Sequence, residues 1–286
     1  MSDTPISSFL GPGSQPGDED GGQLEYMQMP AAMMTFAAPD LPEPEDTAGL
    51  EAAKTALAEV LARLQNYERD GAHNIVSLAG LDAANLELVN QVLGEGEVSV
   101  VAGAELQAQE AVLAGVWRVR GTDGEGRVVR DEIEVGTFPT SVAALAFKDA
   151  RPAVTIPESF APDVFNAPPL LPEINEHIPQ VAAQGVGGAA PHVINLSLLP
   201  HTEADLALLA GLLGEGPLTI LSRGYGNCRV TSSGTHSVWW VQFYNSQDAL
   251  ILNSIEISKM PEVVCAAAED IAESAERLHE ILEVYR

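Results

Sequence analysis

The residues best suited to chemistry gather in RGYGNCRVTS (residues 223–232), where a thiol lies among guanidinium groups. Cys228 directly precedes Arg229, and a cation beside a thiol lowers its pKa and makes it more nucleophilic. The chain has one other cysteine, Cys265, and neither thiol belongs to a CxxC motif or a Cys/His cluster, so the spacing predicts no metal site. Two interpretations of Cys228 stay open: a redox or iron–sulfur cluster-transfer thiol, and a buried, inert side chain.

Catalytic signatures are missing from the sequence. It contains no G-x-S-x-G, HExxH, G-x-G-x-x-G or P-loop pattern, and none of its six histidines stands in an evident relay with Ser or Cys. Two LGEG motifs (93–96 and 213–216) follow predicted helices, whereas phosphate loops precede them. Gly94 and Gly214 are therefore predicted to be left-handed helix ends, and the chain is predicted to be a non-enzyme without a cofactor.

A predicted strand at 236–244 positions a second group of candidate residues. Side chains alternate along a strand, so Trp239 and Val241 share one face while Trp240, Gln242 and Tyr244 share the other. Residues 216–247 contain no carboxylate, although the chain has 41 Asp+Glu against 14 Lys+Arg and a net charge of −27. Aromatic side chains on such a face are typical of a contact surface. The predicted partner-binding residues are Arg223, Tyr225, Asn227, Cys228, Arg229, Trp240, Gln242 and Tyr244.

The same pattern occurs earlier in the chain with different chemistry. At an offset of 122 residues Trp117 and Val119 match Trp239 and Val241, which predicts that these four side chains point into a core. The opposite face of the earlier strand carries Arg118 and Arg120, which favours solvent. The alternative to a partner surface in the second copy is an internal cover, supplied by the N-terminal arm, the linker or the other repeat.

These matches predict an α+β protein with a tandem duplicated domain, each copy a mostly antiparallel β-sheet flanked by two helices. The LGEG motifs repeat at an offset of 120 residues, and the match continues at an offset of 122. Whether the copies share one sheet is left open. The predicted parts are an acidic Pro/Gly/Met-rich arm (1–46), a helix (47–70), a first repeat (71–150), a Pro-rich linker (151–191) with a short helix at 172–177, and a second repeat (192–286) that closes with a helix from Pro261.

Charge and composition exclude several classes of partner. A net charge of −27 repels phosphate backbones and acidic membrane surfaces, whereas a basic peptide is attracted. No apolar run approaches the roughly 20 residues of a membrane span, and the N-terminus does not resemble a signal peptide. We therefore expect a cytoplasmic protein. Its Met-rich segment LEYMQMPAAMMTF (24–36) is suited to docking on the body or on a client.

Longer stretches resemble a known family. GPGSQP (11–16), the two LGEG motifs, YGNCRVTSSGTHSVWWVQFYNS (225–246) and AEDIAESAERLHEI (268–281) are similar to the HupH/HyaF family of bacterial hydrogenase expression proteins. The resemblance covers essentially the whole chain and implies a domain present twice. It also implies a non-enzymatic accessory role in the maturation of uptake [NiFe] hydrogenases. The implied partners are the iron–sulfur small-subunit precursor, bound before twin-arginine export, and a thioredoxin-like accessory protein; a scaffold that bridges accessory proteins is a further alternative.

Overall fold

The structure is a computed structural model that describes residues 41–67, 74–183, 190–224 and 226–285. All of these residues belong to one compact unit, residues 33–286. Of the predicted arm at 1–46, residues 1–40 lie outside the described part of the chain, and so does the proposed docking segment at 24–36. The described chain begins with a single 3₁₀ turn, η1 (Pro44–Thr47).

The chain runs twice through one order of elements, which confirms the predicted duplicated α+β fold. Each half has a helix, a short strand, a second helix, four strands and a short helical turn. The first half comprises α1 (Glu51–Gln65), β1 (Ile75–Ser77), α2 (Ala83–Leu93), β2 (Val98–Ala102), β3 (Leu106–Glu110), β4 (Val116–Thr122), β5 (Val128–Val135) and α3 (Thr140–Ala143). The second half comprises α4 (Leu170–Ala183), β6 (His192–Asn195), η2 (Leu196–Leu198), α5 (Glu203–Leu213), β7 (Glu215–Ser222), β8 (Asn227–Ser233), β9 (Val238–Tyr244), β10 (Leu250–Ile257) and η3 (Glu262–Val264), and α6 (Ala268–Val284) follows it.

The ten strands of the described residues form one antiparallel sheet, so the two halves share a single sheet. Its order is β1-β5-β4-β3-β2-β7-β8-β9-β10-β6. The halves meet where β2 pairs with β7, with Val100 opposite Ile220. Because antiparallel neighbours place paired residues on the same face, the registers define two faces across the whole sheet. Face A carries Trp117, Val119, Trp239 and Val241, and face B carries Arg118, Arg120, Trp240 and Gln242.

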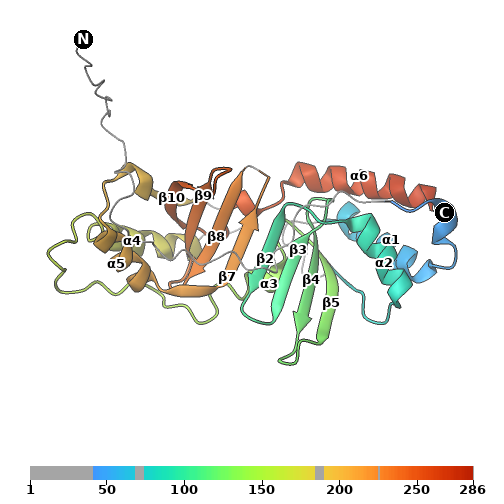
Figure 1. Ribbon diagram of the computed structural model, residues 1–286, viewed down its shortest axis with the longest axis horizontal. Coiled ribbons are helices and arrows are strands. Elements are labelled where there is room, and N and C mark those ends of the chain that lie inside the picture. The colour runs from blue at the N-terminus through green and yellow to red at the C-terminus, as the bar shows by residue number, and fades with distance from the viewer. Residues whose placement is uncertain (1–40, 68–73, 184–189, 225, 286) are drawn as a thin grey trace, which may run out of the picture. The chain divides into compact units, whose positions relative to one another are not determined.

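Helices cover the two faces at different places. On face A the middle of the sheet is buried beneath α3, η3 and their flanking residues, and Trp117 and Trp239 are fully buried there with Phe138, Val142 and Val264. The prediction that both tryptophans point into a core is confirmed. On face B the ends of the sheet are buried instead: α1, α2 and α6 pack over β1, β5 and β4, and α4 and α5 pack over β6, β10 and β9. Figure 1 shows these two helix groups at opposite ends of the sheet.

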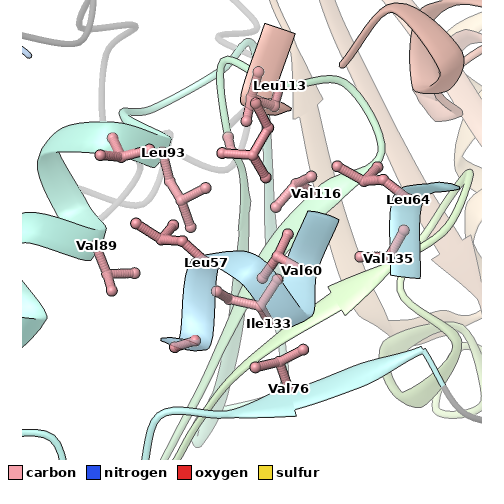
Figure 2. Packing of buried hydrophobic residues seen from close by; sticks show 14 of the residues in the cluster. Leu57, Val60, Leu64, Val76, Val89, Leu93, Leu113, Val116, Ile133 and Val135 are labelled. Carbon is pink, nitrogen blue, oxygen red and sulfur yellow. The ribbon is translucent and has the colours of Figure 1, made fainter. Parts of the chain in front are cut away.

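Amphipathic helix faces account for the cores on face B. In α1, Leu57, Val60 and Leu64 recur at helical spacing and are all buried. Figure 2 shows them meeting Ile133 of β5 and Val76 of β1. The second helices begin at strong caps: Asp82 accepts a hydrogen bond from the backbone of Asn85, and Thr202 forms a capping box with Asp205.

The LGEG motifs have a structural role. Gly94 ends α2 with φ 56° and ψ −163°, and Gly214 ends α5 with φ 69° and ψ −179°. The positive φ matches the prediction, but ψ is extended and not left-handed helical, in a region that essentially only glycine occupies. At the second glycine of each motif, a Cβ atom would lie 2.3 Å from Ala111 O (Gly96) or from Ser232 Oγ (Gly216). The motif therefore permits a sharp exit and then a close approach between strands.

The structure differs from the prediction at three elements. The segment expected as a linker contains the long helix α4, whose Leu171 and Ile174 are fully buried; it corresponds to α1 and opens the second half. The predicted closing helix from Pro261 is interrupted at 265–267, so only α6 is a long helix, and it packs against the first half. Strand β3 was not predicted, since its sequence LQAQE lacks the β-branched residues typical of strands.

Candidate functional site

The candidate site is the middle of face B, between the two groups of helices. Strand pairing places one row of side chains straight across it, from the first half into the second. Leu221 lies at the centre of this row: it is 7% exposed and belongs to none of the three hydrophobic cores. Its neighbours are mostly polar. The full row is Arg118, Gln109, Ser99, Leu221, Arg229, Gln242 and Asn253.

In the second half the row is held by aromatic and amide contacts. The guanidinium of Arg229 lies 5.6 Å from the centroid of the Tyr244 ring, a cation–π arrangement. The Tyr244 hydroxyl donates to Gln242 Oε1 at 3.1 Å, and Gln242 Nε2 donates to Asn253 Oδ1 at 3.4 Å. The surface therefore presents a cation, a ring and amides in fixed positions, all of them partly exposed.

In the first half the equivalent positions carry charged pairs. Arg118 donates to both carboxylate oxygens of Asp131, with Nη2 2.6 Å from Oδ2, and also to Asn90 Oδ1 of α2 at 2.8 Å. Arg120 lies 3.7 Å from the same carboxylate. The offset of 122 residues puts Trp240 in the place of Arg118 and Asn253 in the place of Asp131. The second half has thus replaced an ion pair with an indole and an amide.

Most of the predicted partner-binding residues lie on face B. Trp240 is partly buried against the α4–α5 core, Asn227 is exposed and pairs with Tyr244, and Arg223 follows β7, where its backbone N–H donates to Glu97 O at 3.2 Å. Tyr225 lies outside the described residues. The sequence did not single out Leu221, Gln109 or Asn253 for this site, because only the pairing of β2 with β7 brings the two halves into one row.

Cys228 is separated from the rest of the candidate residues. Strand alternation turns its side chain to face A, opposite Phe243, where it is 2% exposed. Burial, followed by the negative charge of Glu256, raises the pKa of the Cys228 thiol to about 12. Arg229 follows it in the sequence but lies on the other face, so it does not activate the thiol. At neutral pH this thiol is protonated and weakly nucleophilic, which agrees with the buried, inert interpretation.

Burial raises the pKa of two carboxyl groups on face A, Glu110 and Glu256. Glu110 is 8% exposed, and its Oε1 accepts a hydrogen bond from the backbone N–H of Gly115 at 3.3 Å. Burial raises the pKa of Glu110 to about 7, with the charges of Glu97 and Asp270 adding to the shift and the Gly115 hydrogen bond opposing it. A carboxyl group with such a pKa is a candidate general base, but the side chain faces the protein interior, away from the row on face B.

The described residues offer no metal-binding cluster, since they contain no group of three or more His, Cys, Asp or Glu side chains arranged to hold an ion. Nor is any helix within the described ranges long and apolar enough to cross a bilayer. The side chains described on face B can form hydrogen bonds through amides, stack through aromatic rings and pair with charges through arginine.

The chain is similar to several proteins named for a role in hydrogenase expression or formation. The family model of the HupH hydrogenase expression protein, C-terminal conserved region, matches residues 50–155 and 164–285, once in each half. The hydrogenase expression/formation protein HupH of Rhodobacter capsulatus is 48% identical over 280 residues, covering 97% of this chain and 96% of that protein.

Two other relatives agree with this. HupQ of Azotobacter chroococcum mcd 1, a hydrogenase expression/formation protein, is 45% identical over 279 residues, covering 96% of this chain and 95% of its own. The hydrogenase-1 operon protein HyaF of Escherichia coli (strain K12) is 32% identical over 286 residues, covering 98% of this chain and 96% of its own. By these matches, the chain belongs to the HupH/HyaF family of hydrogenase expression/formation proteins.

Proposed function

We propose that this protein is a non-enzymatic accessory protein that binds the precursor of the iron–sulfur small subunit of an uptake [NiFe] hydrogenase before its export. Family membership supports a role in hydrogenase maturation. The observation that carries the binding role is the exchange on face B, where Trp240 and Gln242 stand in the places of Arg118 and Arg120, and Tyr244 stands in the place of Thr122. An immature subunit exposes apolar surface, and an aromatic, carboxylate-free face is suited to hold it.

The acidic N-terminal region gives the client a second point of contact. Between Asp18 and Asp46 the sequence has eight carboxylates and no Lys or Arg. A twin-arginine signal peptide is basic, so charge attraction favours its association with this region. We place this encounter in the cytoplasm, with a thioredoxin-like accessory protein as a further partner. The alternative of cluster transfer through Cys228 gains no support, because that thiol is buried and protonated.

Co-purification from hydrogenase-expressing cells tests the proposal. Tagged wild-type protein is expected to retain the small-subunit precursor, and Trp240→Ala is expected to retain markedly less. Val129→Ala is the matched control, since Val129 is a 67% exposed apolar residue on β5, far along the sheet from the site. Removal of residues 1–40 is expected to weaken retention further in a salt-dependent manner. Equal recovery of the precursor by wild type, Trp240→Ala and the shortened chain would overturn the proposed function.

A further inference from the structure

Large apolar side chains are exposed at one corner of the second half, at the end of the sheet that α4 and α5 cover (Figure 1). Phe165 is 64% exposed, Leu198 is 79% exposed and Leu199 is 42% exposed. Their two segments lie together, since Asn166 Nδ2 donates a hydrogen bond to Pro200 O at 2.9 Å. Exposed apolar residues scattered singly are ordinary, whereas several at one place indicate a contact surface. We call Phe165, Leu198 and Leu199 the apolar corner.

The first half shows that the fold does not require an aromatic ring at this corner. Ala53 and Ala167 are equivalent residues, because each is 0% exposed and donates its backbone N–H to the side chain of the third residue of α2 or α5. Two residues before them stand Glu51 in the first half and Phe165 in the second, and both are exposed. A charged side chain is therefore compatible with this position, and the exposed ring is a property of the second half alone.

The loop that leads into α5 differs from its counterpart in the same way. Val76 of β1 and Ile194 of β6 are equivalent, since each lies opposite the isoleucine that matches at an offset of 122. From there to the residue that caps the next helix, the loop is residues 77–81 in the first half and the longer stretch 195–201 in the second. The exposed positions of the shorter loop hold Ser, Ala and Gly, whereas the longer loop carries both leucines of the apolar corner. The second half has thus gained exposed apolar surface that the architecture does not need.

Carboxylates accompany the apolar corner. Asp163 and Glu203 are both exposed, and the hydroxyl of Thr202, next to Glu203, donates to Asp163 O at 2.9 Å. Within the described ranges neither carboxylate takes part in a salt bridge. The sequence has no Lys or Arg between Arg151 and Arg223. A partner that carries Lys or Arg next to apolar side chains is therefore complementary to this corner.

Charge disfavours the other occupants of such a surface. The apolar segment at 24–36 belongs to an N-terminal region, residues 1–46, that contains no Lys or Arg. A second copy of the chain brings the same carboxylates to the corner, and two molecules of net charge −27 repel one another. Anionic lipid surfaces are repelled for the same reason. A basic segment of another protein meets no such repulsion.

We propose that the apolar corner binds a basic, apolar segment of a protein partner. The apolar side chains of the segment contact Phe165, Leu198 and Leu199, and its Lys or Arg side chains lie beside Asp163 and Glu203. This site shares no residue with the surface around Trp240 that the proposed function assigns to the client, so it can be tested apart from that function.

A designed peptide tests this without any hydrogenase component. The probe is a fluorescently labelled peptide with a Leu- and Val-rich run flanked by arginines, titrated with the full chain while anisotropy is recorded. Phe165→Glu is expected to weaken binding about tenfold or more. Because this change makes the chain more acidic, non-specific attraction of the arginines cannot explain a loss. Val129→Glu is the matched control, since Val129 is 67% exposed on β5 and the change in charge is the same; it is expected to bind like wild type.

A second variant and two further peptides complete the test. Leu198→Ser is expected to weaken binding with an unchanged circular dichroism spectrum, and peptides with Glu in place of Arg, or Ser in place of the apolar residues, are expected to bind far more weakly. Binding that is absent, equal for the Ser peptide, or unchanged in both variants overturns the proposal. Displacement of the probe by a peptide of residues 24–36 would assign the corner to the N-terminal segment, and a dimer that Phe165→Glu dissociates would assign it to a second copy; either result also overturns it.

Discussion

Asn85 and Asp205 occupy the same position in the two halves, 120 residues apart, and each holds the start of its half in place. Asn85 Oδ1 accepts a hydrogen bond from the backbone N–H of Ala53 in the first turn of α1 at 2.9 Å. Asp205 Oδ1 accepts from the backbone N–H groups of Phe165, Asn166 and Ala167 ahead of α4, each at 2.9 Å. This equivalence makes α4 the counterpart of α1, although the proline-rich sequence around α4 resembles a linker.

Asp205→Ala is therefore expected to lower the free energy of unfolding by roughly 2–4 kcal/mol, because several backbone donors would stay buried without an acceptor. Urea unfolding followed by circular dichroism measures the loss. Glu203→Gln, an exposed change in the first turn of the same helix, is expected to alter it little. A loss for Asp205→Ala no larger than for the control would show that the segment ahead of α4 is held by other contacts.

Asp205 also predicts sensitivity to acid. Burial tends to raise the pKa of Asp205, but hydrogen bonds from the backbone of Thr202, Ala167 and Phe165 and from the Thr202 hydroxyl outweigh it and hold the pKa well below its usual range. The stabilisation is thus complete above the unfolded pKa of about 3.9 and is lost as pH falls below it. Unfolding free energies measured between pH 6 and pH 3 are expected to fall more steeply for wild type than for Asp205→Asn.

Glu110 predicts the opposite dependence on pH. Its folded pKa of about 7 lies above the ordinary glutamate value of 4.5, so its contribution is complete below about 4.5 and is lost as pH rises through 7. The loss amounts to about 3 kcal/mol. Glu110→Gln keeps an acceptor for Gly115 and is expected to be more stable relative to wild type at pH 8 than at pH 5. Glu105→Gln, an exposed change nearby, should give the same difference at both pH values.

Gly96→Ala tests the second glycine of the LGEG motif. The new Cβ atom would lie 2.3 Å from Ala111 O, a contact that requires the backbone to shift, so we expect a loss of about 2 kcal/mol or more. A Cβ atom added at Gly124 would meet no heavy atom within 4 Å, and Gly124→Ala in the β4–β5 hairpin serves as the control. Similar melting temperatures for the two variants would refute the close-approach explanation.

The accessibility of Trp240 can be measured directly. Trp117 and Trp239 are 0% exposed, whereas Trp240 is partly exposed, so acrylamide should quench mainly the fluorescence of Trp240. Trp240→Phe is expected to remove most of the quenchable signal, and Trp239→Phe is expected to leave it. Quenching that is unchanged in Trp240→Phe means that this indole is covered and that the proposed surface is not available to a partner.

Cys228 is expected to resist thiol reagents in the folded protein. Its raised pKa of about 12 and its 2% exposure leave little accessible thiolate, whereas Cys265 is less buried. In Cys265→Ser, labelling by Ellman's reagent at pH 8 should be slow until the protein is unfolded. Rapid labelling of the folded Cys265→Ser protein would show that the Cys228 thiol is reactive and would support the cluster-transfer interpretation.

Local features of this fold could be predicted from the sequence, and long-range ones could not. Alternation along β4 and β9 predicted that Trp117 and Trp239 are buried, because a strand fixes which side chains share a face. The same alternation places Cys228 and Arg229 on opposite faces of the sheet. Both were predicted to belong to one candidate site because they are adjacent in the sequence. The proximity of residues on β2 and β7 depends on strand pairing across more than 100 residues of chain, for which neither strand carries a local signal.

The last helix illustrates the same limit. Ile271, Leu278 and Tyr285 recur every seven residues in the sequence, a spacing typical of a covered helix face, and all three are buried. An apolar stripe indicates that a helix face is covered but does not identify the surface that covers it. In this protein that surface is the core of the first half, with α1 as the neighbouring helix.

This placement of α6 has a consequence for biosynthesis. Leu57 and Val60 of α1 share a core with Ile271, Ala275 and Leu278, and the Tyr285 hydroxyl donates to Pro42 O at 3.0 Å. During translation the first half emerges from the ribosome without one wall of its core and without β7 to pair with β2. Nascent chains that stall before α6 would therefore display apolar surface to chaperones and proteases, and the protein reaches its native state only after the last of these residues has left the exit tunnel.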